Sequence, residues 1–222
     1  MDNLSQTEEN YLKAIFKICE QEERAASTNA IAGEMNTAAA SVSDMLKRLA
    51  GKGLIHYEKH RGVTLTETGN QLAVMLVRKH RLWEVFLVKT LNFSWDEVHE
   101  MAEQLEHVQS PELVERLDKF LGHPRFDPHG DPIPDAHGRY AYRRQVQLST
   151  LLTGEKGVVV GVQEHSPVFL QYLDKTGLGL GANVLVQEIF EFDGSLKIAI
   201  EGKSETIISN KVSENVLVQK TK

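Results

Sequence analysis

Apolar positions in the N-terminal part of the chain recur at the spacing of amphipathic helices. The pattern predicts a first helix over residues 5–21 and a short second helix with Thr28 as its N-cap. After a break at Asn36-Thr37, a third helix is expected over residues 38–51. The apolar stripe of the first helix consists of Tyr11, Leu12, Ile15, Phe16 and Ile18.

A hairpin and a long helix complete this N-terminal pattern. Residues 54–65 predict two short strands with a turn at His60-Arg61-Gly62, and residues 66–89 predict a long helix. A helix, a helix–turn–helix and then a hairpin is the order of elements in a winged helix–turn–helix domain.

The second half of the chain changes from helical to β-type patterning. A helix is expected over residues 94–108 and another from Ser110-Pro111 to Leu121, followed by irregular chain over 122–138. Short β-rich pieces come after Gly154, at residues 157–162, 182–192, 196–200, 204–208 and 216–219. They predict a small barrel of about five strands, so the fold class is α+β and multidomain.

Composition adds limits to this picture. With 222 residues, 41% hydrophobic and 25% charged, the chain has the composition of a soluble globular protein, and no apolar run is long enough to span a membrane. The acidic N-terminus is unlike a signal peptide. The single cysteine, Cys19, excludes an intrachain disulfide and indicates the cytoplasm.

Charge is distributed unevenly along the chain, although its net value is −6. Between Arg24 and Arg81 there are nine lysines and arginines against four acids, whereas acids dominate from Trp95 to Asp118. This asymmetry predicts that a first region binds a polyanion and a second region binds cations.

The third predicted helix has the features of a DNA-recognition helix, because it follows a tight turn and begins with small residues. Short polar side chains can reach base edges, and basic ones on the next turn and at the hairpin tip can reach phosphates or the minor groove. The candidate DNA contacts are Thr37, Ser41, Ser43, Asp44, Lys47, Arg48 and Arg61. A protein–protein module of the same shape is the alternative.

Two runs of histidines and carboxylates predict metal binding. His80 and Glu84 are four residues apart, and the residues of the second run, at offsets 0, 4, 7 and 8, are His99, Glu103, Glu106 and His107. At about 100° per residue, each run leaves one face of a helix. Burying so many ionisable groups requires compensation, which a divalent cation provides.

Each run alone also fits ordinary surface ion pairs, and it is their combination on successive helices that favours a metal. Imidazole and carboxylate donors without a thiolate suit Mn²⁺ or Fe²⁺ better than structural zinc. The zincin motif HExxH is absent, because Glu103 stands where the second histidine belongs.

Four segments of the chain resemble the diphtheria toxin repressor/manganese transport regulator family of metal-dependent repressors. They are TEENYLKAIF, VRKHRLWEVFL, EVHEMAEQLEHV and GDPIP. The resemblance implies a homodimer with a winged helix–turn–helix domain over 1–73 and a helical dimerisation and metal-binding domain over 74–140. A linker over 141–154 and an SH3-like barrel of the iron-transport-associated type over 155–222 complete it.

The resemblance also assigns two metal sites in each subunit. Glu103, Glu106 and His107, with Asn10, match the primary ligands, and His80, Glu84 and His99 match the neighbouring site. Glu103 favours Mn²⁺ over Fe²⁺, because iron-responsive relatives carry a softer residue at this position. The metal would fix two DNA-reading domains on double-stranded operator DNA, which makes the chain a repressor of metal-uptake genes and not an enzyme.

The chain departs from the family pattern at two positions. Asn10 replaces a charged or soft ligand, and Lys13 stands where some manganese regulators carry a further carboxylate, which argues against a binuclear pair there. Asp127-Pro-His129-Gly resembles a Cys-Pro-His-Gly turn with second-site ligands. Asp127 and His129 are therefore candidate ligands, and Glu164 or His165 of the barrel could reach the same site.

Two functions of other classes remain as alternatives. A hydrolase with a DNA-binding domain needs an open coordination position and a general base, and no residue with motif support fills that role. A winged-helix regulator could instead sense a non-metal ligand. Membranes and small-molecule substrates are not expected partners.

Overall fold

The computed structural model describes residues 4–22, 24–58, 61–202 and 204–221. These residues form two compact units. The head unit comprises residues 1–80, 103–114 and 134–140, and the barrel unit comprises 81–102, 115–133 and 141–222. Three helices contain residues of both units: α4 (Glu67–Leu91), α5 (Val98–Leu105) and α6 (Pro111–Phe120).

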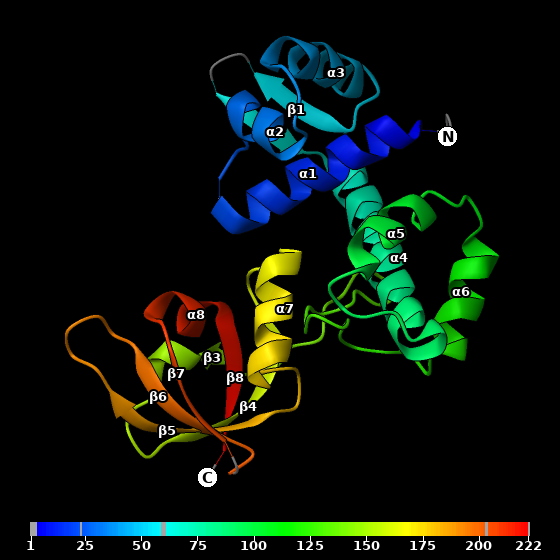
Figure 1. Ribbon diagram of the computed structural model, residues 1–222. Coiled ribbons are helices and arrows are strands. Elements are labelled where there is room, and N and C mark those ends of the chain that lie inside the picture. The colour runs from blue at the N-terminus through cyan, green and yellow to red at the C-terminus, as the bar shows by residue number, and fades with distance from the viewer. Residues whose placement is uncertain (1–3, 23, 59–60, 203, 222) are drawn as a thin grey trace. The chain divides into compact units, whose positions relative to one another are not determined.

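The head unit has the predicted winged helix–turn–helix order (Figure 1). Its elements are α1 (Gln6–Glu22), α2 (Thr28–Glu34), α3 (Ala39–Gly51), β1 (Ile55–Glu58), β2 (Gly62–Leu65) and the start of α4 (Glu67–Leu91). The N-cap of α2 is Ser27, whose side chain accepts from the Ala30 N–H, and not Thr28 as expected. His60 of the predicted turn lies outside the described residues.

One apolar core holds the head unit together. The predicted stripe of α1 is buried, and it packs with apolar side chains from α2, α3 and both wing strands. β1 and β2 pair antiparallel, with Ile55 opposite Leu65 and Glu58 opposite Gly62. Leu12, Leu46 and Val63 have no exposed surface, so α1 is a fixed part of the domain that contains α3, the helix expected to read DNA.

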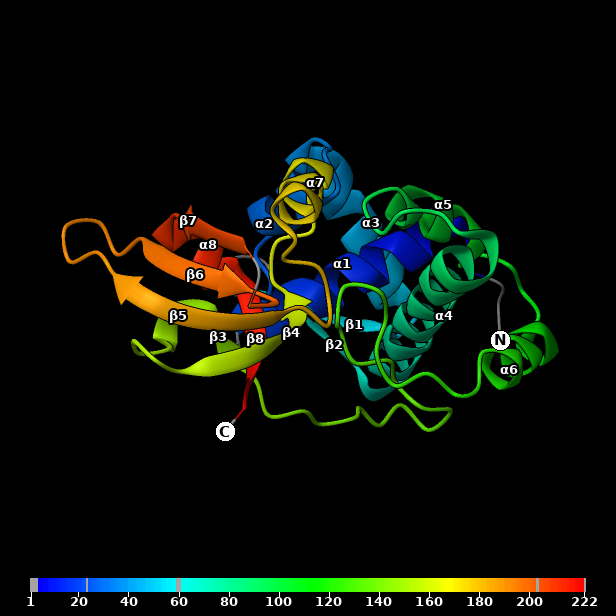
Figure 2. The same cartoon turned by 60° about the horizontal axis from the view of Figure 1, so that its bottom comes forward.

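The barrel unit contains a curved six-stranded sheet with the order β3-β8-β4-β5-β6-β7 (Figure 2). The strands are β3 (Val146–Gln147), β4 (Lys156–Val162), β5 (Asn183–Ile189), β6 (Leu196–Ile200), β7 (Ser204–Ile208) and β8 (Val216–Thr221). All pairings are antiparallel. β3 and the 3-10 turn η1 (Leu148–Thr150) fall inside the predicted linker, and Leu148 is completely buried in the barrel core.

Two helices of the barrel unit were not expected from the sequence. α7 (Pro167–Thr176) begins after the N-cap Ser166 and ends at Gly177, whose φ of 77° is the left-handed conformation that stops a helix. α8 is Asn210–Asn215. Leu170 and Leu173 of α7 are buried in the barrel core, so the helix closes one side of the sheet.

The remaining helices are α5 (Val98–Leu105) and α6 (Pro111–Phe120). Residues 122–138 are irregular as predicted, apart from an isolated bridge between Phe126 and Pro132. Among the described residues, no helix combines the length and apolar character needed to cross a membrane.

Candidate metal centres and nucleic-acid interface

The acidic run at residues 99–107 does not form one continuous helix. α5 ends at Leu105, and Glu106 and His107 lie in the turn that follows. The prediction that all four metal-competent side chains leave one helix face is therefore wrong. The next helix, α6, begins at Pro111, and residues 106–110 form the turn and irregular chain between the two helices.

The head unit gathers the second part of this run around a buried carboxylate. Glu106 has no exposed surface. The Nζ of Lys13 donates to both its oxygens, at 2.6 and 2.8 Å, and the Nδ1 of His80 lies 2.6 Å from its Oε2. We call the set Glu9, Lys13, His80, Glu106 and His107 the helix cluster, since α1 and α4 supply three of its five members.

Glu9 is a member of the helix cluster that the sequence did not reveal. Its Oε2 lies 2.5 Å from the Nδ1 of His107, and its Oε1 accepts from the Nε2 of Gln109 at 2.7 Å. A carboxylate on one ring nitrogen orients a histidine and leaves the other nitrogen for a metal. An acid in the first turn of a helix is ordinary, so its only signal was its place beside Asn10.

Positive charge inside the helix cluster balances its carboxylates. Burial raises the pKa of Glu106, but the hydrogen bond from His80 and the Lys13 ammonium outweigh it and hold that pKa below its usual value. Burial lowers the pKa of half-buried Lys79, against the opposing charges of Glu9 and Glu106. The Lys13 ammonium therefore occupies the place beside Glu106 that a metal ion would take.

Two predicted metal ligands lie near the helix cluster but make fewer contacts with it. Glu103, on the last turn of α5, is half exposed and lies 3.6 Å from the Lys13 Nζ. Asn10 is partly buried, and no hydrogen bond of its side chain is seen in the described part of the chain. The structure thus brings Glu106 together with His80 and pairs His107 with Glu9, and leaves Asn10 and Glu103 at the edge.

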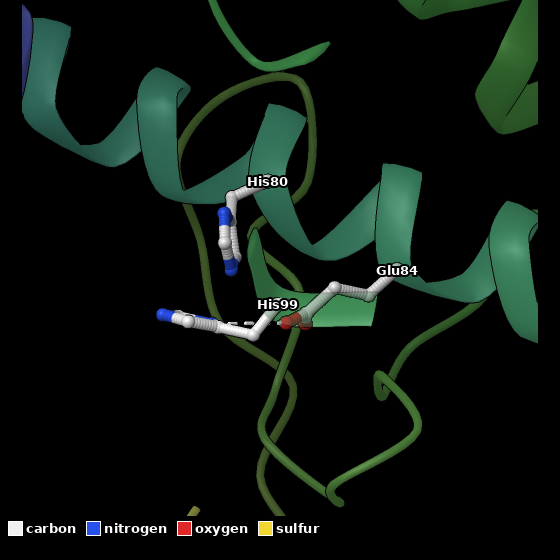
Figure 3. A group of neighbouring side chains, drawn as sticks. All are labelled: His80, Glu84 and His99. Atoms are coloured by element: carbon white, nitrogen blue, oxygen red, sulfur yellow. Dashed lines mark hydrogen bonds and ion pairs between the residues drawn. The ribbon is translucent and has the colours of Figure 1, made fainter. Parts of the chain in front are cut away.

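The first part of the acidic run meets a different partner. In the barrel unit, the Nδ1 of His99 lies 3.4 Å from the Oε1 of Glu84, which is almost completely buried. Figure 3 shows His80 and Glu84 one turn apart on the same face of α4, with the His99 ring beside the carboxylate. The helical spacing predicted for His80 and Glu84 is confirmed.

Glu84 also belongs to a second group in the barrel unit, which we call the loop cluster: Glu84, Asp127 and His129. All three are buried, and each offers a ligand atom within 4.8 Å of the other two. The His129 Nε2 donates to the Trp95 carbonyl at 2.8 Å, which leaves Nδ1 facing the Glu84 Oε2 at 3.7 Å. The hydrogen bond to a carbonyl sets the tautomer that presents Nδ1 as a metal ligand.

The charges of the loop cluster are strongly coupled. Burial, with the nearby charges of Glu84 and Asp131, raises the pKa of Asp127 to about 7. Burial opposes protonation of His129, but its hydrogen bond with Glu84 and the charges of Glu84 and Asp127 raise its pKa to about 9. The raised pKa values favour protons on Asp127 and His129, which offset part of the buried negative charge, and a divalent cation can take over that role.

The barrel fixes the loop that carries Asp127 and His129. The Asp127 Oδ1 accepts from the backbone N–H groups of His129 and Asp131, at 2.8 and 3.0 Å. The carbonyl of His129 accepts from the N–H of Val162 on β4 at 3.0 Å. Gly130, at φ 91°, lies so close to β4 that an added Cβ would stand 2.2 Å from the Val160 carbonyl oxygen. Only glycine fits here.

The two alternatives from the barrel behave differently. The His165 ring lies 5.0 Å from that of His129, centroid to centroid, and its Nε2 faces the Val162 carbonyl oxygen at 3.3 Å. Glu164 instead accepts from the backbone N–H of Ser166 at 2.8 Å, at the start of α7. The structure places His165 beside the loop cluster, whereas Glu164 stabilises a helix start.

Both clusters offer carboxylate oxygens and imidazole nitrogens, the types of donor atom that suit a divalent ion of the manganese or iron class. Such ions bind oxygen and imidazole ligands at about 2.0–2.6 Å, so ligand atoms on one ion lie within about 5 Å of each other. The loop cluster meets this separation without any rearrangement. Its nearest cation, the Arg81 Nε, is 3.5 Å from the Asp127 Oδ2, whereas the helix cluster holds an ammonium on its central carboxylate.

The predicted DNA-reading residues lie on α3, just before it, and beside the wing turn. All are exposed except Ser43, which is partly buried and donates to the Ala39 carbonyl oxygen at 3.0 Å. Four of the exposed residues are in ion pairs. The Nε of Arg48 lies 2.9 Å from the Oε1 of buried Glu8. Asp44 pairs with Lys47 at 3.0 Å and Arg61 with Glu58 at 2.9 Å, each across three residues of the chain. These short-range pairs are weak in water, so the lysine and arginine can exchange them for phosphates.

Three family models match the chain. The model described as "Iron dependent repressor, N-terminal DNA binding domain" matches residues 3–63. The model for the metal binding and dimerisation domain of the same repressors matches residues 66–135, and a FeoA domain matches residues 146–220.

Similar proteins cover nearly the whole chain. "Iron-dependent repressor IdeR" of Mycobacterium leprae is 31% identical over 99% of this chain and 100% of its own. "Diphtheria toxin repressor" of Corynebacterium diphtheriae is 30% identical over 95% and 96%. A solved structure described as "Manganese-dependent transcriptional repressor complex with manganese" has a TM-score of 0.82 at 34% identity, over 96% of this chain and 100% of that chain.

Proposed function

The chain belongs to the iron-dependent repressor family of metal-dependent, DNA-binding repressors, and we propose that Mn²⁺, in preference to Fe²⁺, is its activating ion. Its regulatory site is the helix cluster, and its target is double-stranded operator DNA controlling metal-uptake genes in the cytoplasm. The observation that carries this proposal is the convergence of Lys13, His80 and Glu106 in the same compact unit as the recognition helix.

The preference for manganese rests on the ligand chemistry. The ionisable donor atoms in both clusters are carboxylate oxygens and imidazole nitrogens, without thiolate or thioether, and this set suits a hard ion. Glu103, at the edge of the helix cluster, adds a further carboxylate rather than a soft ligand. Similar proteins include both iron-dependent and manganese-dependent repressors. The proposal for manganese therefore rests on the donor atoms of the two clusters and on Glu103.

We assign one ion to each cluster, giving two per subunit. A bound divalent ion supplies positive charge that neutralises the carboxylates. In the helix cluster, Glu106 has to exchange Lys13 for that charge, and His107, oriented by Glu9, presents its free ring nitrogen. In the loop cluster, Glu84, Asp127 and the Nδ1 of His129 already converge, and His99 is a further donor beside Glu84.

Dimerisation completes the proposal. The family model over residues 66–135 describes a dimerisation domain. Five of the twelve large apolar side chains that are exposed in the described chain lie within it: Leu91, Phe93, Val108, Leu113 and Phe120. We propose that a second copy of the chain covers part of this set, so that the dimer presents two recognition helices to two operator half-sites.

The decisive experiment is a metal titration of DNA binding. Duplexes are selected from a random-sequence pool by the protein in Mn²⁺, and the affinity of the selected duplex is then measured with Mn²⁺, Fe²⁺ under anaerobic conditions, or Zn²⁺. We expect tight binding that depends on the metal and is reached with Mn²⁺ at the lowest free concentration. Metal-independent affinity would favour the sensor of a non-metal ligand, and metal-dependent cleavage of the duplex would favour the hydrolase.

A further inference from the structure

Glu8 is a fully buried carboxylate on the first turn of α1 that the metal clusters do not use. Its Oε2 accepts from the backbone N–H and the hydroxyl of Ser5, at 2.8 and 3.1 Å. Burying an ionised carboxylate requires partners of opposite charge as well as hydrogen bonds. Burial raises the pKa of Glu8, but the hydrogen bonds from Lys52 and Ser5 lower it below its usual value.

The compensating cations come from the end of the recognition helix. The Nζ of Lys52, the C-cap of α3, lies 2.7 Å from the Glu8 Oε1, and the Nε of Arg48 lies 2.9 Å from the same atom. The Arg48 side chain remains 58% exposed. Because Arg48 uses its Nε on Glu8, the outer edge of its guanidinium stays available for a phosphate.

The next residues of α1 belong to the helix cluster. Glu9 lies against His107, and Lys13, little more than one turn further on, lies against Glu106. Residues 8 to 13 of one helix span only about 7–8 Å. Within that length, α1 holds the end of the recognition helix with one carboxylate and the metal-binding turn with the following one.

We propose that Glu8 is a positioning residue that couples the helix cluster to DNA binding. It does so by tying the Arg48 and Lys52 end of α3 to the part of α1 that carries Glu9 and Lys13. A change in the cluster that shifts these two residues also shifts the Glu8 carboxylate, and with it the two cations that face DNA. The inference rests on the proposed function, because it assigns a route for the metal response rather than the response itself.

The test variant is Glu8→Gln. Glutamine has the same shape and keeps an oxygen for Ser5, but it loses the charge that holds Arg48 and Lys52. Its matched control is Glu34→Gln, because exposed Glu34 pairs with Lys17 of α1 at 2.8 Å and removes the same charge without touching α3. A third variant, Arg48→Gln, removes the other half of the pair.

The measurement is the affinity of the selected duplex with and without Mn²⁺, at several salt concentrations, together with Mn²⁺ affinity with and without DNA. Two ratios follow: the DNA affinity with Mn²⁺ divided by that without it, and the Mn²⁺ affinity with DNA divided by that without it. By thermodynamic reciprocity, the two ratios must be equal in each variant. We expect Glu8→Gln to bind Mn²⁺ alone as the wild type does, but to lose at least fivefold in both ratios.

The control variants and the wild type distinguish a failure of this inference from a failure of the proposed function. In the Arg48→Gln background, adding Glu8→Gln should lower the ratio by a smaller factor than in the wild type, because only Lys52 is still held by Glu8, and Glu34→Gln should behave as the wild type. Unchanged ratios in a folded Glu8→Gln, judged by its metal-free melting temperature, would overturn the inference and leave the proposed function intact. A wild-type ratio near one would overturn the proposed function itself.

Discussion

The two metal-competent clusters of this protein neutralise their buried carboxylates in different ways. The helix cluster holds an internal cation, because Lys13 donates to both oxygens of Glu106. In the loop cluster, Glu84, Asp127 and His129 turn their ligand atoms toward one another, and the guanidinium of Arg81 stays 3.5 Å to the side. One cluster is closed by its own ammonium, whereas the other is arranged for an ion.

This difference explains why one cluster suits a switch and the other a resident ion. An ion enters the loop cluster without breaking a protein–protein ion pair between carboxylate and lysine. In the helix cluster, every ion bound competes with Lys13, so occupancy is reached only at a higher free metal concentration. On the proposed function, a threshold of this kind in the same compact unit as α3 would let the repressor respond to the concentration of metal.

The largest expected effect is on the loop cluster. Glu84→Gln removes the carboxylate shared by Asp127, His129 and His99, and we expect affinity for the tighter ion to fall about 100-fold, equivalent to about 2.7 kcal/mol. Isothermal titration calorimetry with Mn²⁺ should then show one high-affinity ion fewer bound per subunit. Exposed Glu100, also near His99 in sequence, provides the control Glu100→Gln. Binding of two Mn²⁺ ions per subunit to Glu84→Gln with wild-type affinities would contradict the assignment.

A backbone change tests whether the barrel positions the loop cluster. Gly130→Ala places a Cβ against the Val160 carbonyl oxygen and forces alanine into a left-handed conformation. We expect the barrel unit to lose roughly 2 kcal/mol of stability in chemical denaturation, with weaker Mn²⁺ binding at the tight site only. The control is Gly154→Ala, which has a similar φ of 86° and open space around it. Equal effects of the two variants would show that contact with β4 is unimportant.

Removing the internal cation should have the opposite effect on the helix cluster. Lys13→Gln frees Glu106 from its ammonium, and we expect metal affinity there to rise about tenfold, or 1.4 kcal/mol. The metal-free protein should melt at a lower temperature, because a buried carboxylate loses a charged partner. Lys17→Gln, four residues along α1, is the control. A Lys13→Gln protein with weaker metal binding would show that Lys13 supports the site rather than competing for it.

The smallest effect concerns Asn10. Its side chain makes no hydrogen bond within the described residues, so we expect Asn10→Ala to change metal affinity at the helix cluster by less than about threefold, or 0.7 kcal/mol. Glu9→Gln, in contrast, should weaken it by about 10–100-fold, since a carboxylate that orients a ligating histidine has effects of this size. The same titration compares the two. A large loss of metal affinity in Asn10→Ala would show that Asn10 is a metal ligand after all.

Sequence reasoning recovered local features well and long-range contacts poorly. The head-unit helices and the wing follow from apolar periodicity, and β6 and β7 were predicted to the residue. α7 was missed, although Ser166-Pro167 and Gly177 are ordinary start and stop signals, because it lies among β-rich segments. Periodicity also extended α5 through Glu106 and His107, whereas the helix ends at Leu105.

The site residues illustrate the same limit. His80 with Glu84, and His107 beside Glu106, were visible as helical or adjacent spacings. The pairing of Glu9 with His107 joins positions 98 residues apart, and no local pattern encodes it. Lys13 was visible as a departure from the family, but its hold on Glu106 needed three-dimensional contacts. The types and local spacing of the candidate ligands can therefore be predicted from the sequence, whereas the residue that each side chain contacts depends on tertiary packing.

The central claim is that the helix cluster controls DNA binding and the loop cluster does not do so alone. The most direct test measures the affinity of the selected duplex against free Mn²⁺ for the wild type, Glu106→Gln and His129→Ala. We expect Glu106→Gln to lose the metal response while folding normally, and His129→Ala to keep a response with a shifted midpoint. A full Mn²⁺ response in Glu106→Gln, with the response abolished in His129→Ala, would contradict the account.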